Sequence, residues 1–208
     1  MKIVLTGQKA FGKAVLKKLI EDGHEIVGVA PAPQGVKKDK MVGIALKYGI
    51  PVLTDAGKLT SNDIPEGTDL VVAAHSHWIV SEKIIEKAKY GAIGFHPSLL
   101  PLHRGQDAVR WTVKMGDKVT GGTVFKLNDV ADGGDVIKRE LVFVEKDWDY
   151  HQLWNKLFPI GVNMLSEVVK SIEKNGMPEG EKQSSEIATW EPSFHRERLH
   201  RNELVQLE

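Results

Sequence analysis

Cysteine is absent from this chain of 208 residues, and no charge of one sign predominates. Without cysteine, disulfides, thiolate nucleophiles and cysteine-ligated zinc are excluded, and we expect a reducing, cytoplasmic location. Lysine plus arginine total 28, and aspartate plus glutamate also total 28, so no overall field draws the protein toward nucleic acid or an anionic membrane. Any charged partner is therefore expected to be recognised by local groups.

Long apolar runs are also missing. The start of the chain, Met1–Gly7, carries one lysine and a short apolar stretch. This stretch is too short for a signal or membrane segment and predicts a first buried strand instead. The chain length suits one α/β domain with a short appendage. Because the composition turns polar after Pro178, we predict a domain over residues 1–180 and a C-terminal tail over residues 181–208.

The alternation of predicted elements is typical of a doubly wound sheet. Strands are predicted at residues 3–6, 25–30, 51–53, 69–74 and 91–95, and helices at residues 14–20, 40–48 and beyond Ser81, a candidate N-cap. This order predicts an α/β fold with a Rossmann-like, mostly parallel sheet. Ligands of such sheets bind at the carboxyl ends of the strands, where the sequence places His75-Ser76-His77 and His96.

The second half of the chain predicts longer elements. Residues 107–115 have a helical pattern, and residues 120–127 and 135–144 are predicted as two strands, antiparallel to each other, on either side of the Asp132 loop. Residues 150–174 predict a helix. Because Pro159-Ile160-Gly161 interrupts its pattern, we expect a break or kink there.

The most informative residues are a histidine and an aspartate, each held in a constrained loop. His96 begins the run His96–Gly105, which contains two prolines and ends on glycine, and Asp132 is followed by two glycines. Pro97 favours an extended conformation at His96. A constrained imidazole and carboxylate are typical of an acid/base pair that works at neutral pH. The sequence therefore indicates an enzyme.

The glycine loop after the first strand has two interpretations. Residues 7–12, Gly-Gln-Lys-Ala-Phe-Gly, open a helix, so their amides either cradle an anion or merely allow a tight turn. The pattern is not Gly-x-Gly-x-x-Gly, and the second strand ends on Val29-Ala30 rather than on an acidic residue. A nicotinamide cofactor is therefore not expected.

Three further histidines also have alternative interpretations. His75 and His77 would face one side of an extended segment, a spacing that suits metal ligation, and a metal hydrolase would add His96 and Asp132 to them. No other pattern supports such a site, so a polar loop lining a pocket is favoured and no metal is expected. His103 is interpreted as a surface or substrate-contact histidine.

The central motifs resemble a known family. The run His-Pro-Ser-Leu-Leu-Pro at 96–101, Arg104-Gly105 and Asp132-Gly133-Gly134 are together similar to the signature of the tetrahydrofolate-dependent formyltransferases. That family includes glycinamide ribonucleotide formyltransferase, methionyl-tRNA formyltransferase, sugar N-formyltransferases and the hydrolase domain of 10-formyltetrahydrofolate dehydrogenase. Further matches at residues 1–12, 111–112, 158–161 and 188–190 look most like that hydrolase domain and the methionyl-tRNA formyltransferase core. The resemblance implies the formyltransferase fold and 10-formyltetrahydrofolate as the formyl donor.

The resemblance also implies roles for single residues. His96 would polarise the formyl group or shuttle its proton, and Asp132 would tune the imidazole and help to remove a proton from the attacking amine or water. A carboxylate beside an imidazole favours imidazolium, so the pair also suits a developing oxyanion. The implied folate-binding residues are His75, Ser76, His77, Trp78, Leu99, Pro101, Asn128, Val130 and Ala131. The implied substrate-binding residues are Gly7, Gln8, Gly94, Ser98 and Arg104.

One departure from the family pattern leaves three functions open. The transferases typically carry an asparagine two residues before the histidine, where an amide can hold the formyl oxygen, and this chain has Gly94 there. Formyl transfer to a small amine-bearing acceptor is our first expectation. Hydrolysis of 10-formyltetrahydrofolate to formate and folate binding without turnover are the alternatives. The acceptor itself has no general sequence signature.

Nucleic acid is not expected as the acceptor. Methionyl-tRNA formyltransferases resemble this core plus a C-terminal domain that helps to hold tRNA, and that domain is missing from the sequence. The cluster Arg196–Arg201 is interpreted as a mixed-charge, solvated helix. The tail, rich in tryptophan and arginine, is a candidate contact with a second subunit.

Overall fold

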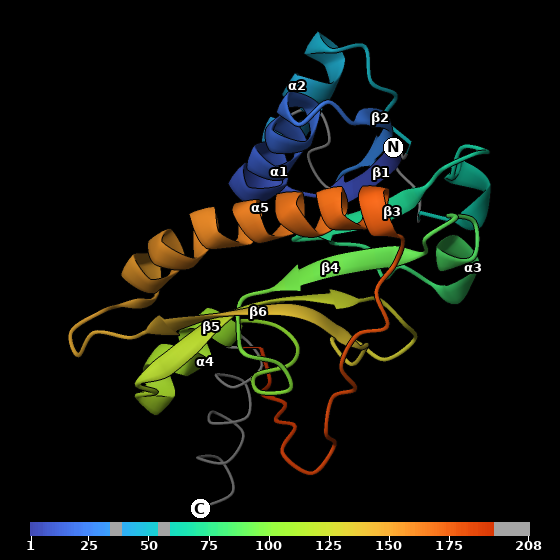
Figure 1. Cartoon of the computed structure of the whole chain (residues 1–208). Coiled ribbons are helices and arrows are strands. Elements are labelled where there is room, and N and C mark those ends of the chain that lie inside the picture. Colours follow the sequence, from blue (N-terminus) through green and yellow to red (C-terminus); the bar gives the residue numbers. More distant parts are fainter. Residues whose placement is uncertain (34–38, 54–58, 194–208) are drawn as a thin grey trace, which may run out of the picture.

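The structure, a computed structural model, describes residues 1–33, 39–53 and 59–193. A six-stranded sheet with the order β2-β1-β3-β4-β5-β6 forms its centre (Figure 1). The strands are β1 (Lys2–Gly7), β2 (Glu25–Ala30), β3 (Leu70–Ala74), β4 (Ala92–His96), β5 (Val119–Lys126) and β6 (Val136–Phe143). The first four are parallel to one another, whereas β5 and β6 are antiparallel to their neighbours. The predicted mostly parallel, doubly wound α/β fold is confirmed.

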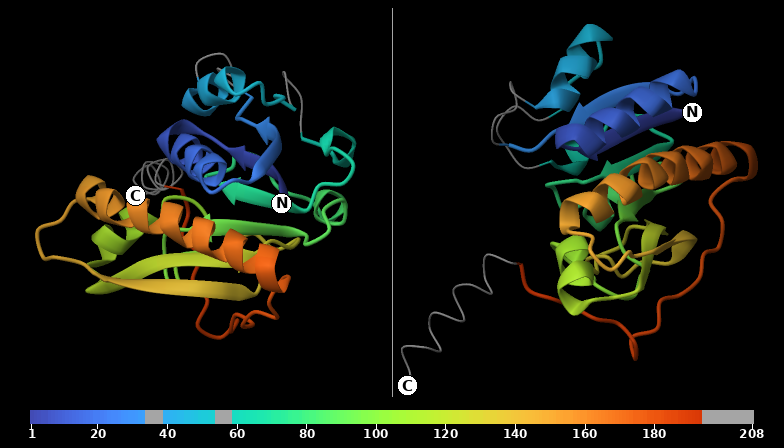
Figure 2. Two further views of the ribbon diagram at one scale, coloured as in Figure 1. Left: turned by 45° about the horizontal axis from the view of Figure 1, so that its top comes forward. Right: turned by 90° about the vertical axis from the view of Figure 1, so that its left-hand side faces the viewer.

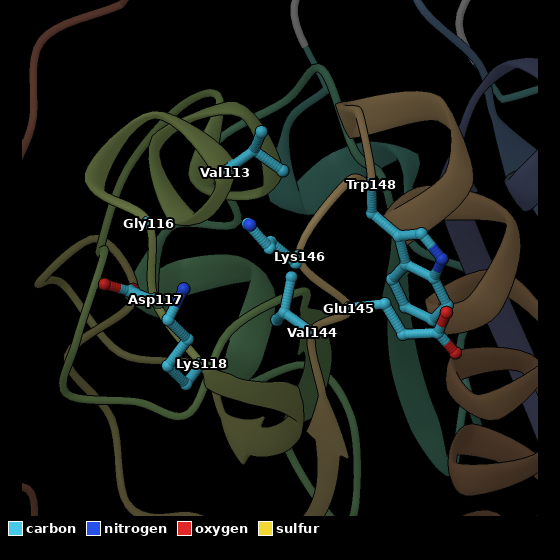
Figure 3. A pocket seen from close by; sticks show the side chains of 8 residues that line it. All are labelled: Val113, Gly116, Asp117, Lys118, Val144, Glu145, Lys146 and Trp148. Atoms are coloured by element: carbon cyan, nitrogen blue, oxygen red, sulfur yellow. The ribbon is translucent and has the colours of Figure 1, made fainter.

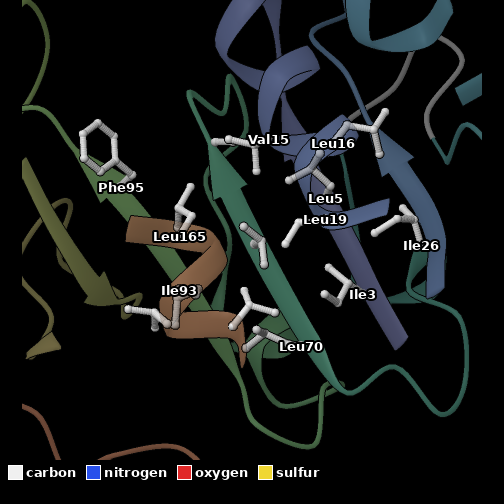
Figure 4. Packing of buried hydrophobic residues seen from close by; sticks show 14 of the residues in the cluster. Ile3, Leu5, Val15, Leu16, Leu19, Ile26, Leu70, Ile93, Phe95 and Leu165 are labelled. Atoms are coloured by element: carbon white, nitrogen blue, oxygen red, sulfur yellow. The ribbon is translucent and has the colours of Figure 1, made fainter. Parts of the chain in front are cut away.

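Helices cover both faces of the sheet. On one face lie α1 (Lys9–Glu21) and α5 (Tyr150–Asn175), which Figures 1 and 2 show side by side, with α2 (Lys40–Lys47) packed against α1. The core beneath them joins side chains of β1, β3 and β4 to both long helices (Figure 4). A second apolar cluster on the opposite face involves α3 (Glu82–Ile85). The remaining helix, α4 (Ala108–Met115), packs against α5.

The strand sequences explain the position of each strand. β3 reads Leu-Val-Val-Ala-Ala and is buried throughout, as expected for a central parallel strand that is covered on both faces. β1 ends on Gly7, where an added Cβ would lie 2.5 Å from the carbonyl oxygen of Ala74. Glycine therefore allows the ends of β1 and β3 to lie close together at the edge where ligands of this fold bind.

Two predicted elements are shorter than expected. Residues 51–53 form no strand, and Val52 makes only an isolated parallel bridge with Val29, because Pro51 has no N–H to donate to a ladder. The helix after Ser81 is a single turn, and the Ser81 side chain makes no cap hydrogen bond. The chain returns to the sheet soon after it, since the Tyr90 N–H donates to the Asp69 carbonyl.

We expected a break or kink in the helix over residues 150–174, but α5 runs from Tyr150 to Asn175 without a break and with Pro159 inside it. Pro159 is exposed, whereas Gly161 is buried against the Phe95 ring, which would lie 2.6 Å from an added Cβ. Packing of the buried face therefore maintains the helix through the proline. No helix in the described part of the chain is long and apolar enough to cross a membrane.

Candidate active site

His96 is the last residue of β4 and is 6% exposed. Its Nε2 lies 2.7 Å from the carbonyl oxygen of His103. A carbonyl can only accept, so Nε2 carries a proton and donates it. The other ring nitrogen, Nδ1, lies 3.6 Å from Oδ2 of Asp132. The ring is thus oriented by the main chain on one side, and its second nitrogen faces the carboxylate.

Asp132 lies near the end of β4, although its loop leaves β5 opposite the start of β4. β5 runs antiparallel to β4, and its last residue, Lys126, pairs with Ile93 rather than with His96. The loop between β5 and β6 nevertheless brings Asp132 back to the carboxyl end of β4. The Gly105 N–H donates to Oδ2 of Asp132 at 2.8 Å, so the main chain of the His96 loop also holds the carboxylate.

Unusual backbone conformations gather in the loops around this pair. His103, Asp107 and Asp132 have positive φ values of 53°, 63° and 51°. Residues other than glycine rarely adopt positive φ values, and such conformations persist only where the surrounding structure maintains them. Their concentration in the loops near His96 is typical of a functional site.

The loop that follows His96 is held by its own side chains. Ser98 is fully buried, and its hydroxyl donates to the Leu102 carbonyl at 2.6 Å. The Thr123 hydroxyl donates to the Ser98 carbonyl at 2.7 Å and accepts from the Leu100 N–H. Ser98 therefore has a structural contact in this loop. Thr123, which lies opposite His96 on β5, is a residue of the site that the sequence analysis did not identify.

Two of the residues predicted to bind folate belong to the same loop. Leu99 is half-buried, and its Cδ2 would lie 2.6 Å from a Cβ added to Gly121. Pro101 is buried and follows a cis peptide bond. Across from them, the β5–β6 loop exposes Asn128, Val130 and Ala131. The Oδ1 atom of Asn128 accepts from the Val130 N–H at 3.0 Å, which shapes the loop before Asp132.

Arg104 is a buried cation without a carboxylate partner among the described residues. It is 8% exposed, and both its Nε and one terminal nitrogen donate to Oε1 of Gln183, at 3.1 and 2.8 Å. Its guanidinium also lies 5.6 Å from the centre of the Trp190 ring. Gln183 and Trp190 belong to the tail, so residues far along the chain complete this part of the site.

His103 is not the surface residue that one interpretation expected, and its contact with a substrate stays a prediction. His103 is 6% exposed. Its Nε2 lies 2.8 Å from Asp117 and its Nδ1 lies 3.0 Å from Glu191, so carboxylates from two distant segments enclose the ring. A histidine between Leu102 and Arg104 gave no sequence signal of this environment, because both partners come from elsewhere in the chain.

The remaining predicted residues form a second group at the carboxyl ends of β1 and β3. The hydroxyls of Thr6 and Ser76 lie 2.7 Å apart, and the Trp78 indole N–H donates to the Pro31 carbonyl at 2.7 Å. A cavity of about 320 Å³ lies beside them, lined by Gln8, Ala32, Pro33 and His77. This volume is within the range of small-molecule sites.

The histidines after β3 differ in their surroundings. The pKa of His75 lies below its ordinary value, because neighbouring chain partly removes the ring from water and the Lys9 ammonium lies nearby. No three side chains of the metal-binding types gather in the described part of the chain. His75, His77, His96 and Asp132 therefore do not form the single metal site that one interpretation of the sequence required.

Gly94 occupies a position with little free space. A Cβ added there would lie 2.9 Å from Cδ2 of Leu127 and 3.4 Å from the Phe125 ring. Apolar side chains thus fill the room that the family's asparagine would need.

Figure 3 shows a second, much smaller cavity, near Asp117 and Trp148, of about 30 Å³. This volume holds about one water molecule. It is too small for a substrate.

Comparisons with known proteins identify the family of this chain. The formyl transferase family model matches residues 1–169. The chain is 35% identical over 208 residues to the cytosolic 10-formyltetrahydrofolate dehydrogenase of Xenopus tropicalis. The matched region covers 95% of this chain but only 23% of that protein. It is also 35% identical over 207 residues to the methionyl-tRNA formyltransferase of Bacillus subtilis, covering 94% of this chain and 65% of that protein. The chain thus spans less than two thirds of these relatives.

Solved structures share the fold at low identity. An N-formyltransferase from Helicobacter canadensis, in complex with folinic acid and dTDP-3-aminofucose, superposes with a TM-score of 0.75 at 16% identity, covering 92% of this chain and 70% of that one. A glycinamide ribonucleotide transformylase from Symbiobacterium toebii superposes with a TM-score of 0.69 at 18% identity, covering 88% of this chain and 92% of that one.

Proposed function

Because this chain belongs to the formyl transferase family, we propose that it moves the formyl group of 10-formyltetrahydrofolate to an amine. The observation that carries the proposal is the spacing of His96 and Asp132. The 3.6 Å between Nδ1 and Oδ2 lets one amine nitrogen or water oxygen hydrogen-bond to both atoms at ordinary lengths. A nucleophile bound there would lose its proton to this pair as it attacks the formyl carbon.

Contacts around the pair support separate tasks for its two members. The hydrogen bond to the His103 carbonyl keeps the proton of His96 on Nε2, so Nδ1 is the atom that exchanges a proton. The Gly105 N–H holds Oδ2 of Asp132 at a constant distance from the ring. Such preorganisation avoids the cost of orienting the groups during the reaction.

The folate donor would lie between the two loops that meet at the pair. The exposed Asn128, Val130 and Ala131 offer main-chain groups to a pterin, and half-buried Leu99, next to buried Pro101 in the chain fold, offers apolar surface. When bound, 10-formyltetrahydrofolate supplies the formyl carbon. The Helicobacter canadensis N-formyltransferase was solved in complex with folinic acid, and the sugar 3N-formyl transferase WlaRD, which shares the fold, was solved in the presence of 5-N-formyl-THF. Both support a folate of this kind, and nothing in the proposal requires a metal.

The amine acceptor would enter from the carboxyl ends of β1 and β3. The cavity lined by Gln8, Ala32, Pro33 and His77 opens there, next to Gly7, where an added Cβ would collide with the Ala74 carbonyl. Buried Arg104, which lacks a carboxylate among the described residues, is the proposed contact for an acidic group of a substrate. We propose a small metabolite as acceptor.

Hydrolysis is the second candidate, and Gly94 favours it. Leu127 and Phe125 fill the space beside Gly94, so no side-chain amide can hold the formyl oxygen from this position. Loss of one such donor commonly costs about 10²–10³ in rate. Water in place of the amine would give formate and tetrahydrofolate with the same acid/base pair.

The deciding experiment follows the release of tetrahydrofolate from 10-formyltetrahydrofolate by absorbance, with purified protein, with and without a panel of amines. The panel includes an amino-sugar nucleotide, glycinamide ribonucleotide and a hydroxylated ornithine. His96→Ala is the control for background breakdown of the donor.

Release that depends on one amine supports the transferase and identifies its acceptor. Release without any amine, lost in His96→Ala, supports the hydrolase. Donor binding without release under every condition would refute both and leave a folate-binding module.

A further inference from the structure

Gln183 uses every polar atom of its side chain within the candidate site. Its Oε1 accepts from Nε and a terminal nitrogen of Arg104. Its Nε2 donates to the main-chain carbonyls of Asp132 at 2.8 Å and Gly134 at 2.7 Å. Arginine can only donate and carbonyls can only accept, so these partners determine the orientation of the amide.

The contacts of Gln183 join the two loops that carry the reacting pair. Arg104 belongs to the loop that begins at His96, and Asp132 belongs to the loop between β5 and β6. The Gly105 N–H ties the same two loops through the carboxylate of Asp132. Gln183 therefore holds the main chain of Asp132, while Gly105 holds its side chain.

The segment around Gln183 is anchored at both ends on these loops. Before it, Glu181 pairs with Val136 at the start of β6. After it, the Thr189 carbonyl accepts from the Arg104 N–H, and the Thr189 hydroxyl accepts from the His103 N–H at 2.7 Å. Figure 1 shows this segment in red, running from the end of α5 past the β5–β6 hairpin. Gln183 is thus held in place by main-chain contacts of its own segment in addition to those of its side chain.

We propose that Gln183 is a positioning residue that keeps Asp132 within reach of His96. The inference rests on the proposed function, because it assigns to Gln183 an effect on the proton transfer of that reaction. Asp132 has a positive φ of 51°, and main-chain contacts must maintain such a conformation. The Gln183 amide supplies these contacts to the carbonyl of Asp132 itself.

Only an amide meets the requirements of this position. The site needs one acceptor toward a guanidinium and two donors toward carbonyls. A carboxylate could accept from Arg104, but its other oxygen would face two carbonyl oxygens without a proton between them. Gln183→Glu therefore keeps the size and the contact with Arg104, adds a negative charge beside that guanidinium, and removes the contacts with the Asp132 loop. Gln183→Leu removes the same contacts without adding a charge.

The test compares Gln183→Glu and Gln183→Leu with the unchanged protein in the tetrahydrofolate-release assay. Lys182→Ala is the matched control, because Lys182 is the exposed neighbour in the same segment. We expect kcat to fall about 10–100-fold in both Gln183 variants, with the KM for 10-formyltetrahydrofolate within about twofold of the unchanged value. Both variants are assayed well below their melting temperatures.

A double-mutant cycle with Asp132→Asn separates positioning from general support of the fold. If Gln183 acts through Asp132, Gln183→Leu will cost less than about twofold in kcat once Asp132 is already Asn. Multiplicative losses in the cycle, or kcat values equal to that of Lys182→Ala, would overturn the proposal.

A readout without turnover covers the outcome in which the proposed reaction is absent. The Gly105 amide proton donates to Asp132, so its hydrogen exchange reports how firmly that carboxylate is held. We expect faster exchange at Gly105 in Gln183→Leu and unchanged exchange in Lys182→Ala. Unchanged exchange in Gln183→Leu overturns the inference, and a chain without turnover but with faster exchange overturns only the proposed function.

Discussion

The His96 imidazole is held by groups that come from two other parts of the chain. The carbonyl of His103 fixes the proton on Nε2, and Asp132 faces Nδ1. Asp132 is in turn held by the Gly105 N–H and, through its carbonyl, by Gln183. His96 thus depends on a main-chain contact within its own loop, whereas Asp132 depends on the main chain of the His96 loop and on Gln183. Substitutions at single residues should separate these contributions.

Replacement of Asp132 by Asn tests the acid/base pair. The amide keeps the shape of the carboxylate but cannot accept a proton, so we expect kcat to fall about 10²–10⁴-fold. The Kd for the folate donor should change less than about twofold, since the proposed folate contacts in this loop are main-chain groups. Single-turnover kinetics and a fluorescence titration measure the two quantities. Asp135→Asn, in the same glycine turn, is the control, and a rate for Asp132→Asn equal to that control would remove Asp132 from the mechanism.

Replacement of Gly94 by Asn tests the missing donor. The new side chain would collide with Leu127, 2.9 Å from the added Cβ, so we expect the free energy of unfolding to fall by about 1–3 kcal/mol. The double variant Gly94→Asn/Leu127→Ala makes room and should recover part of this loss. Urea unfolding measures both, with Leu127→Ala alone as the reference. Amine-dependent turnover that stays unchanged in the folded double variant would show that Gly94 does not limit the reaction.

At the scale of elements, α5 carries more of the fold than its sequence pattern suggested. It packs on the core of the sheet. A capping box at its start satisfies two main-chain donors. The Asp149 side chain accepts from the Gln152 N–H at 2.8 Å, and the Gln152 side chain accepts from the Asp149 N–H at 2.9 Å. The helix continues through Pro159 because this packing stabilises it by more than the proline destabilises it.

The cap of α5 provides a prediction at this scale. Asp149→Ala removes the acceptor for the Gln152 N–H and should lower the free energy of unfolding by about 1 kcal/mol. Asp149→Asn retains an acceptor oxygen and should stay within about 0.5 kcal/mol of the unchanged protein. Thermal or urea unfolding distinguishes the two. Equal losses in both variants would mean that the charge, rather than the hydrogen bond, stabilises this end of the helix.

At the scale of the whole molecule, two buried groups make the protein sensitive to acid. Burial opposes ionisation of Asp22, but hydrogen bonds from Lys170, Lys18 and Ser166 outweigh it and hold the pKa of Asp22 well below 3.8. Burial also lowers the pKa of His24 below 6.5, with Glu173 opposing the shift. In both cases the unfolded chain binds more protons than the native protein, so stability falls as the pH falls.

The two groups act in different pH windows. His24 should cause a loss of stability as the pH falls through about 6.5, and Asp22 a second loss below about 3.8. Asp22→Asn should lower the free energy of unfolding at pH 7 by about 1–3 kcal/mol and flatten the second loss, leaving the first in place. Unfolding curves from pH 8 to pH 3 test this. A second loss of the same size in Asp22→Asn would assign the acid sensitivity to other carboxylates.

Sequence patterns predicted the framework because they report burial. The continuous apolar run of β3, the alternation of strands with helices and the predicted antiparallel pair around Asp132 all follow from which side chains avoid water. Residues 51–53 and the turn after Ser81 were less well predicted. Short segments contain too few side chains to show a hydrophobic period, so the available main-chain hydrogen-bond partners decide their conformation. The cluster Arg196–Arg201 lies outside the described residues.

The sequence by itself determined the fold class, the family and the identity of the two constrained residues, His96 and Asp132, because burial patterns and local motifs depend on neighbours along the chain. Only the tertiary structure decided how these residues are held. The carboxylates around His103, the return of Asp132 to the end of β4 and the link from Gln183 to both loops all join segments that are distant in sequence. Hydrogen bonds and ion pairs depend on distances in space, and folding alone brings these groups within reach of one another.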